Sequence, residues 1–163
     1  MATPFSLPVQ MFLREVEKDR DFFHYSDLSR EECMKMAEQR AKNILIEAIQ
    51  LFILKATPDI DLNDYNAGDE TFSEDLTNQE IYLLSRLMYQ IYLERDVAHL
   101  KGLSVNFTST DLRVLDPSNA RISFLKLYEV VCNENISYIE AYKSKDRVTG
   151  EIKTINYASY DED

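Results

Sequence analysis

The chain contains few residues of the kinds that catalyse reactions or hold metals, and they do not fall into a known pattern. Its two histidines, His24 and His99, have neither a second histidine nor a cysteine at the spacing of a zinc site. Cys33 and Cys132 stand outside any CxxC pair, which predicts two reduced thiols. Glycine-rich phosphate loops and the GxSxG motif of hydrolases are absent from the sequence. We therefore expect a protein without enzymatic activity and without a cofactor.

An acidic segment, residues 56–80, carries a partial calcium-loop motif. It contains eight acidic residues and no lysine or arginine. Positions 1, 3, 5 and 12 of a calcium-binding loop are matched by Asp59, Asp61, Asn63 and Glu70. The glycine required at position 6 is Asp64, and the apolar position 8 is Asn66. The mismatches favour a solvated acidic loop over a metal site, with calcium binding as the alternative.

The charge of the whole chain limits its possible ligands. Eighteen basic and 29 acidic residues give a net charge of -11, which repels the phosphate backbone of nucleic acids. Free-standing binding to duplex DNA is therefore not expected. Ten tyrosines are the unusual feature of the composition, and tyrosine supplies amphipathic contact area at protein interfaces.

Two capping boxes mark the starts of long helices. Thr77 followed by Glu80 predicts a helix over residues 77–100, and apolar residues cover most of its circumference. Such a helix is normally buried on more than one side, so we expect it to be the central element. Ser29 followed by Glu32 predicts a second helix that runs to about residue 55, with small residues along its first half.

The remaining segments are less strongly patterned. Residues 5–18 predict a short, mobile helix with Ser6 as a possible cap, and the aromatic residues between positions 19 and 27 should dock on the core or on a neighbouring subunit. After residue 100 the helical periodicity is lost, and Val105 with Phe107 suggests a short strand or an extended run. Asp116 and Pro117 predict the start of the last helix, which we expect to leave the core before Tyr142.

The C-terminal residues predict an arm. Polar and apolar residues alternate about Thr149 and Gly150, which is typical of a hairpin or an extended strand with a turn. A two-stranded hairpin is marginally stable alone, so its apolar residues should pack on a partner. The residues expected at this interface are Tyr138, Tyr142, Val148, Ile152, Ile155 and Tyr157.

These elements define the expected fold class as mainly α. We predict a small bundle of three to four helices, with a long acidic loop and a C-terminal β-hairpin or extended arm. The predicted division is a helical domain over residues 1–142 and an arm over residues 143–163. Neither a signal peptide nor an apolar run long enough to span a membrane is recognised, so no membrane association is expected.

Residues 72–142 resemble a known family in the order of their motifs. The segments are FSEDLTNQEIYLLSRLMYQIYLERDV and FTSTDLRVLDPSNARISFLKL, followed by a helix that ends in a tyrosine-rich arm. This order resembles the small neck, or head-to-tail connector, proteins of tailed bacteriophages. The resemblance implies a structural virion protein that forms a homo-oligomeric ring under the portal and contacts portal, tail or neck proteins.

The same resemblance implies where the protein would act. It places the protein in the neck of the virion, assembled in the host cytoplasm, where DNA passes through the channel without specific binding. The acidity of the chain fits a channel wall that does not grip phosphate. The alternative is a small acidic cytosolic binding or regulatory protein, with calcium binding through residues 59–70 as a variant.

Overall fold

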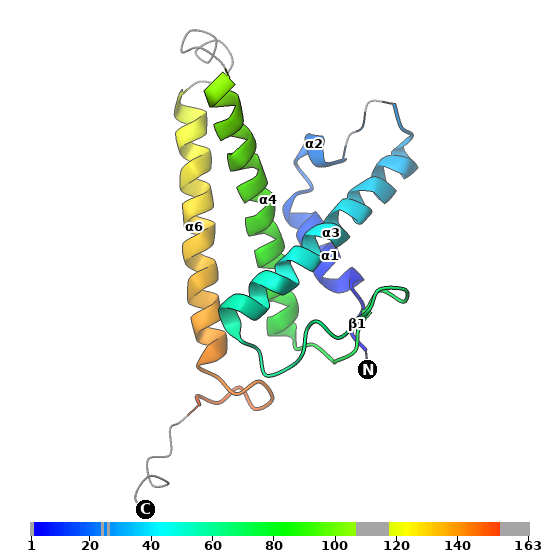
Figure 1. The fold of residues 1–163 in the computed structure, drawn as a ribbon, viewed down its shortest axis with the longest axis vertical. Coiled ribbons are helices and arrows are strands. Elements are labelled where there is room, and N and C mark those ends of the chain that lie inside the picture. The colour runs from blue at the N-terminus through cyan, green and yellow to red at the C-terminus, as the bar shows by residue number, and fades with distance from the viewer. Residues whose placement is uncertain (1, 24, 26, 107–117, 154–163) are drawn as a thin grey trace, which may run out of the picture.

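The computed structural model of the chain describes residues 2–23, 25, 27–106 and 118–153. Its helices and strands, in chain order, are α1 (Ser6–Glu15), α2 (Arg20–Phe23), α3 (Arg30–Ala56), β1 (Tyr65–Asn66), β2 (Thr71–Phe72), α4 (Asn78–Asn106) and α6 (Ser118–Lys143). The predicted class, a mainly helical bundle, is confirmed. In Figure 1, α6 runs alongside α4 in the opposite direction, and α3 crosses α4 obliquely.

Helix α4 is the central element, as its apolar circumference predicts. It contacts α1, α3 and α6, and Leu84, Leu87 and Met88 are completely buried. The capping box at its start is formed, because the Thr77 amide donates to Glu80 Oε2 over 2.7 Å and the Glu80 amide donates to Thr77 Oγ1 over 3.3 Å.

The predicted end of this helix is wrong. Helix α4 continues beyond residue 100 to Asn106, so Val105 is helical and does not lie in a strand. A short polar and apolar alternation cannot by itself interrupt a helix that already has a complete ladder of backbone hydrogen bonds. Phe107, Asp116 and Pro117, the other residues of these predictions, lie outside the described residues.

Helix α3 begins at the predicted capping box and presents small residues to the core. Ser29 is its N-cap and forms reciprocal hydrogen bonds with Glu32. Three alanines of one face, Ala37, Ala41 and Ala48, have no exposed surface. Their small side chains allow α3 to approach its neighbours closely, and α3 contacts α1, α2, α4 and α6.

Helix α1 is part of the core, so the expectation of a mobile helix is wrong. Phe12 is completely buried, and its ring lies 5.5 Å from that of Phe22 and 6.1 Å from that of Tyr92. The aromatic cluster joins α1, α2 and α4, which confirms that an aromatic residue before α3 docks on the core. The N-cap of α1 is Phe5, and Ser6 is the first helical residue and not its cap.

The acidic segment is held against the N-terminus by backbone hydrogen bonds. The Phe72 amide donates to the Thr3 carbonyl and the Phe5 amide donates to the Glu70 carbonyl, each over 2.8 Å. Leu62 and Phe72 are almost fully buried although acidic residues surround them in sequence. The apolar residues of the segment therefore close one end of the core, while most of its carboxylates face the solvent.

Helix α6 stays on the core to its last turn. Val131, Asn135, Ile139 and Tyr142 recur at three- and four-residue spacing and are all buried. The expectation that this helix leaves the core before Tyr142 is therefore wrong. Of the three polar residues that suggest an early departure, Asn133 and Glu134 are exposed beside the buried face, whereas Asn135 is buried and donates a hydrogen bond to Gln90.

Among the described residues, none of the helices combines the length and the apolar composition that a membrane-spanning segment needs.

Candidate functional site

The residues that follow α6 form a compact turn, residues 144–153, which we call the turn segment. Lys145 and Ile152 form an isolated antiparallel bridge, and the Lys153 amide donates to the Ser144 carbonyl over 2.8 Å. The carboxylate of Asp146 accepts hydrogen bonds from the Thr149 and Val148 amides and from the Thr149 hydroxyl. These hydrogen bonds stabilise the ionised form and lower the pKa of Asp146. Gly150 adopts a φ of 71°, which suits glycine.

A buried ionic contact attaches the turn segment to the start of α4. Arg147 Nε donates to Glu80 Oε1 over 2.7 Å, and Tyr142 Oη donates to the same oxygen over 2.8 Å. Glu80 has no exposed surface, and its other oxygen accepts from the Thr77 amide. A guanidinium NH2 group of Arg147 also donates to the Asp75 carbonyl. We call Glu80, Tyr142 and Arg147 the clasp.

Burial and hydrogen bonding have opposite effects on the clasp carboxylate. Burial alone raises the pKa of Glu80, but hydrogen bonds from Arg147, Thr77 and Tyr142 outweigh it, and the pKa is lowered. Burial, followed by the bond to Glu80, raises the pKa of Tyr142. Glu80 is therefore ionised at neutral pH and Tyr142 remains a neutral donor. The clasp is a satisfied charge pair that fixes the turn segment to the bundle.

Only some of the predicted interface residues are exposed. Val148 and Ile152 of the turn segment keep 85% and 71% of their surface exposed. Tyr138 is partly exposed and its ring packs against that of Tyr82 at 5.7 Å. Tyr142 is instead buried in the clasp, because its hydroxyl finds a carboxylate partner inside the subunit. Ile155 and Tyr157 lie outside the described residues, as does His24.

The calcium-loop candidates are engaged in contacts within the chain. Asp59 pairs with Lys153 over 2.9 Å and Glu70 pairs with Lys42 over 2.6 Å. Asp61 accepts from the Asn63 amide, and Asn63 Oδ1 accepts from Gln50. The four residues therefore have different partners, and no group of three or more acidic, histidine or cysteine side chains in the described part of the chain could hold a metal ion.

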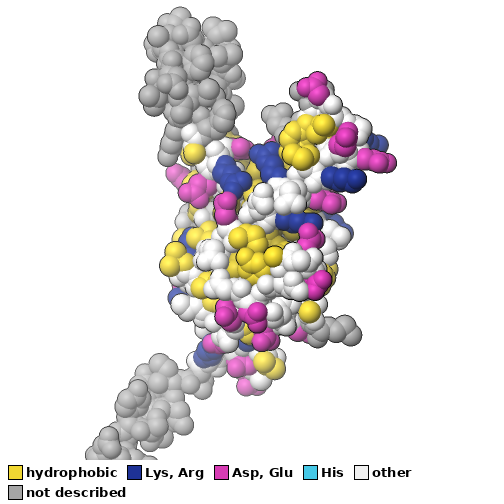
Figure 2. Space-filling view, turned by 45° about the vertical axis from the view of Figure 1, so that its right-hand side comes forward, with side chains coloured by type: hydrophobic (Ala, Val, Ile, Leu, Met, Phe, Trp, Pro, Cys, Tyr) yellow, Lys and Arg dark blue, Asp and Glu magenta, His cyan; other side chains and the backbone are white. Residues whose placement is uncertain are grey.

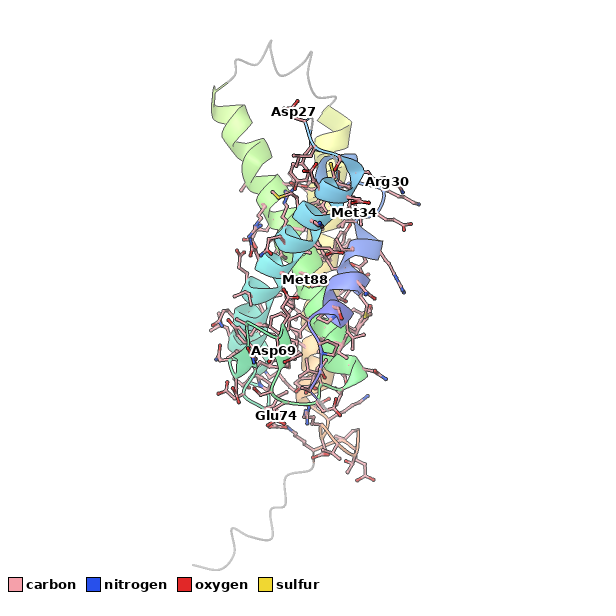
Figure 3. The ribbon with its side chains drawn as sticks, turned by 90° about the vertical axis from the view of Figure 1, so that its right-hand side faces the viewer. Asp27, Arg30, Met34, Asp69, Glu74 and Met88 are labelled. Carbon is pink, nitrogen blue, oxygen red and sulfur yellow. The ribbon has the colours of Figure 1, made fainter. Side chains whose placement is uncertain are left out.

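The acidic segment and the turn segment lie at the same end of the molecule. Figure 3 places Asp69 and Glu74 in the half of the molecule that carries the turn segment, with Glu74 the nearer of the two, and Asp27 and Arg30 at the opposite end, with Met88 between them. Figure 2 shows acidic side chains spread over the surface, with apolar side chains gathered in patches between them. This end therefore combines exposed carboxylates with the exposed apolar tip of the turn segment.

A second polar contact joins α1, α4 and α6 in the bundle. Arg86 lies between Glu134, 2.6 Å away, and Glu15, 3.9 Å away. The buried Asn135 donates to Gln90 Oε1 over 2.9 Å. Burial raises the pKa of Glu15 and the nearby Arg86 opposes the effect. We read this cluster as structural, because it connects three helices along their length and its charged members pair with one another.

The sequence patterns missed the clasp. The sequence identifies Glu80 only as part of a capping box, and Arg147 is one of four basic residues in the arm, with Lys143, Lys145 and Lys153. One signal was available, because Glu80 continues the spacing of the apolar residues Leu84, Leu87 and Ile91 and therefore falls on a buried face. Nothing local in the sequence identifies Arg147 as its partner.

Comparisons of the chain with protein-family models, curated proteins and solved structures found no match.

Proposed function

We propose that this protein is a structural subunit of a tailed-bacteriophage virion, a head-to-tail connector that works by assembly and not by catalysis. In this role it forms a homo-oligomeric ring under the portal, extends the DNA channel, and contacts portal, tail or neck proteins. Its place is the neck of the virion, after assembly in the host cytoplasm.

The turn segment is the observation that carries this proposal. Its base is fixed to the bundle by a buried charge pair, while Val148 and Ile152 at its tip face the solvent. Exposed apolar side chains on a rigidly attached segment are typical of a binding surface whose partner is missing. The segment already has the conformation in which it binds, so little conformational entropy is lost on association. A C-terminal arm that begins with this segment and docks on a neighbouring subunit fits the connector role.

The charge of the chain supports a channel that releases DNA. Tight DNA binding depends on neutralising phosphates with lysine and arginine, and this chain has 29 acidic residues against 18 basic ones. An acidic ring would repel the duplex from its wall. DNA then passes through the ring without specific binding.

Assembly is the property to measure. The chain is expressed together with the portal protein encoded in the same genome, and complexes are purified on a tag carried by the portal. We expect the full chain to co-purify and to form rings visible by negative-stain electron microscopy. A variant that lacks residues 148–163 keeps Arg147 and hence the clasp, and we expect it to remain folded but to lose incorporation.

Two outcomes would contradict the proposal. Normal incorporation of the truncated variant would show that the arm is not the contact that assembles the ring. The second outcome is a full chain that stays monomeric in the presence of the portal protein and whose gene has no portal or capsid gene beside it. That result would favour a small acidic binding or regulatory protein instead.

A further inference from the structure

A surface groove lies between α3 and α4, away from the clasp. Its apolar lining is Leu51 and Leu54 from α3 and Ile91 from α4, and its volume is about 390 Å³. That volume is within the range of about 300–1,000 Å³ common for binding pockets. Leu54, in the last turn of α3, keeps 78% of its surface exposed and adds to the apolar lining that solvent can reach.

The edges of the groove are mainly acidic. Glu47 and Glu94 line it together with Arg95, and the guanidinium of Arg95 is already paired with Glu47. Gln50 on the same edge donates to Asn63 over 2.7 Å, so the groove borders the acidic segment directly. A basic occupant with apolar side chains would match both the lining and the edge.

The turn segment has that composition. Residues 144–153 carry three basic and two acidic residues, whereas the whole chain has a net charge of -11. Lys153 already pairs with Asp59 of the acidic segment, so its basic residues do contact acidic ones of this chain. Val148 and Ile152 supply exposed apolar side chains of a size that fits a groove lined by leucine and isoleucine.

The occupant cannot be the turn segment of the same subunit in this conformation. Arg147 at one end is held by Glu80, and Lys153 at the other end is held by Asp59. With both ends attached to their own subunit, the tip between them points into solvent, as the exposure of Val148 requires. A second copy of this chain presents the same tip without this restriction, and the tip matches the groove in charge and apolar character.

We propose that the tip of the turn segment, Val148 and Ile152, docks in the α3–α4 groove of a neighbouring copy, with Lys145 against Glu94. Tip and groove are different surfaces, so the contact is heterologous, and its repetition gives a closed ring or a filament. This inference deepens the proposed function, because it names the surface that receives the arm within the ring.

Disulfide trapping between two different variants tests the contact. In a Cys132→Ser background, one chain carries Val148→Cys and a chain of different mass carries Leu54→Cys. Each variant has a single introduced thiol, so a mixed disulfide forms only between subunits. The native Cys33 is buried. The chains are mixed at roughly 0.5 mM and oxidised slowly, because contacts with a Kd near 1 mM are partly populated at that concentration.

The control replaces the groove cysteine with one at a distant exposed site. Met36→Cys lies near the other end of α3 and its side chain is 47% exposed. We expect the pair of positions 148 and 54 to exceed the control by about tenfold in yield, the ratio that about 1.4 kcal/mol of specific binding produces. Adding Glu94→Lys to the groove chain should remove the excess, and adding Lys145→Glu to the tip chain should restore it. Equal yields for both pairs would overturn the proposal.

The result can be separated from the proposed function. If wild-type chains form rings with the portal but the mixed disulfide stays at the control level, the docking surface is wrong and the connector role stands. If the disulfide forms but the chain never joins a portal complex, the contact between copies stands and the phage role is wrong.

Discussion

Glu80 shows how one buried carboxylate connects distant parts of this chain. It caps the first turn of α4, accepts a hydrogen bond from Tyr142 of α6 and pairs with Arg147 of the turn segment. A buried charge is tolerated only when its oxygens are fully hydrogen-bonded, and three different donors meet that condition here. The residue therefore couples the start of α4 to the end of α6.

Removing Arg147 should leave that carboxylate without its counter-ion. We expect Arg147→Ala to lower the free energy of unfolding by about 3 kcal/mol at pH 7, because an unpaired buried charge remains. Urea denaturation of the variant and the wild type measures the difference. As a control, Lys153→Ala removes an exposed pair with Asp59 and should cost less than about 1 kcal/mol.

The pH dependence of this loss provides a second test. In the wild type the pKa of Glu80 is lowered on folding, so its contribution is complete above the unfolded pKa and is lost as pH falls through the folded pKa. Without Arg147, burial dominates, and the pKa of Glu80 in the folded variant should lie above that in the unfolded chain. Protonation of Glu80 should therefore stabilise the folded variant. The difference between the two proteins should therefore shrink from pH 7 towards pH 4. A difference that does not change with pH would show that Glu80 is not the group affected.

At the scale of the element, α4 carries most of the packing. Helices α1, α3 and α6 all contact it. A helix in this position has little room for rearrangement, since side chains fill its surroundings to the density of a crystal. Truncating a buried side chain of α4 should therefore lower the free energy of unfolding strongly.

Leu84→Ala and Met88→Ala should each lower the free energy of unfolding by about 2–5 kcal/mol, the usual range for emptying a core site. Both side chains are completely buried, so solvent does not fill the cavity that each substitution leaves. Leu54→Ala is the matched control, because its side chain is mostly exposed and its loss should stay within about 0.5 kcal/mol. Chemical denaturation measures all three, and losses below about 1 kcal/mol at both core sites would mean that α4 is not the centre of the core.

At the scale of the whole molecule, the first and the last described residues of the chain contact the acidic segment. The N-terminal residues hydrogen-bond to its backbone, and the turn segment contacts it through Arg147 and Lys153. Thr3 also donates to Asp75 and accepts from the Leu76 amide over 2.8 Å. Contacts that are far apart in sequence thus close one end of the bundle.

Two truncations that differ only in the turn segment test this arrangement. Deleting residues 148–163 keeps the clasp and should change the free energy of unfolding by less than about 1 kcal/mol. Deleting residues 144–163 also removes Arg147 and should cost about 3 kcal/mol more. Thermal and urea unfolding of both variants, with helical content followed by circular dichroism, give the comparison. Equal stability of the two truncated chains would mean that the clasp does not stabilise the bundle.

The sequence alone determined the features that depend on neighbouring residues. The capping boxes at Ser29 and Thr77 involve partners three residues away, and both are formed. The apolar circumference of α4 required burial on several sides, and the small residues of α3 required close packing. Each of these follows from helical geometry, in which residues three and four apart share a face.

Only the tertiary structure decided which of the distant residues meet. Glu80 and Arg147 are 67 positions apart, and Thr3 and Leu76 are 73 positions apart. The sequence patterns placed Tyr142 at an interface, whereas packing of α6 on α4 brings its hydroxyl to a buried carboxylate. Each such pairing depends on how the helices pack, because a charged or aromatic side chain can find a partner in many places along a chain. The lowest free energy is reached only where burial and hydrogen bonding are satisfied together.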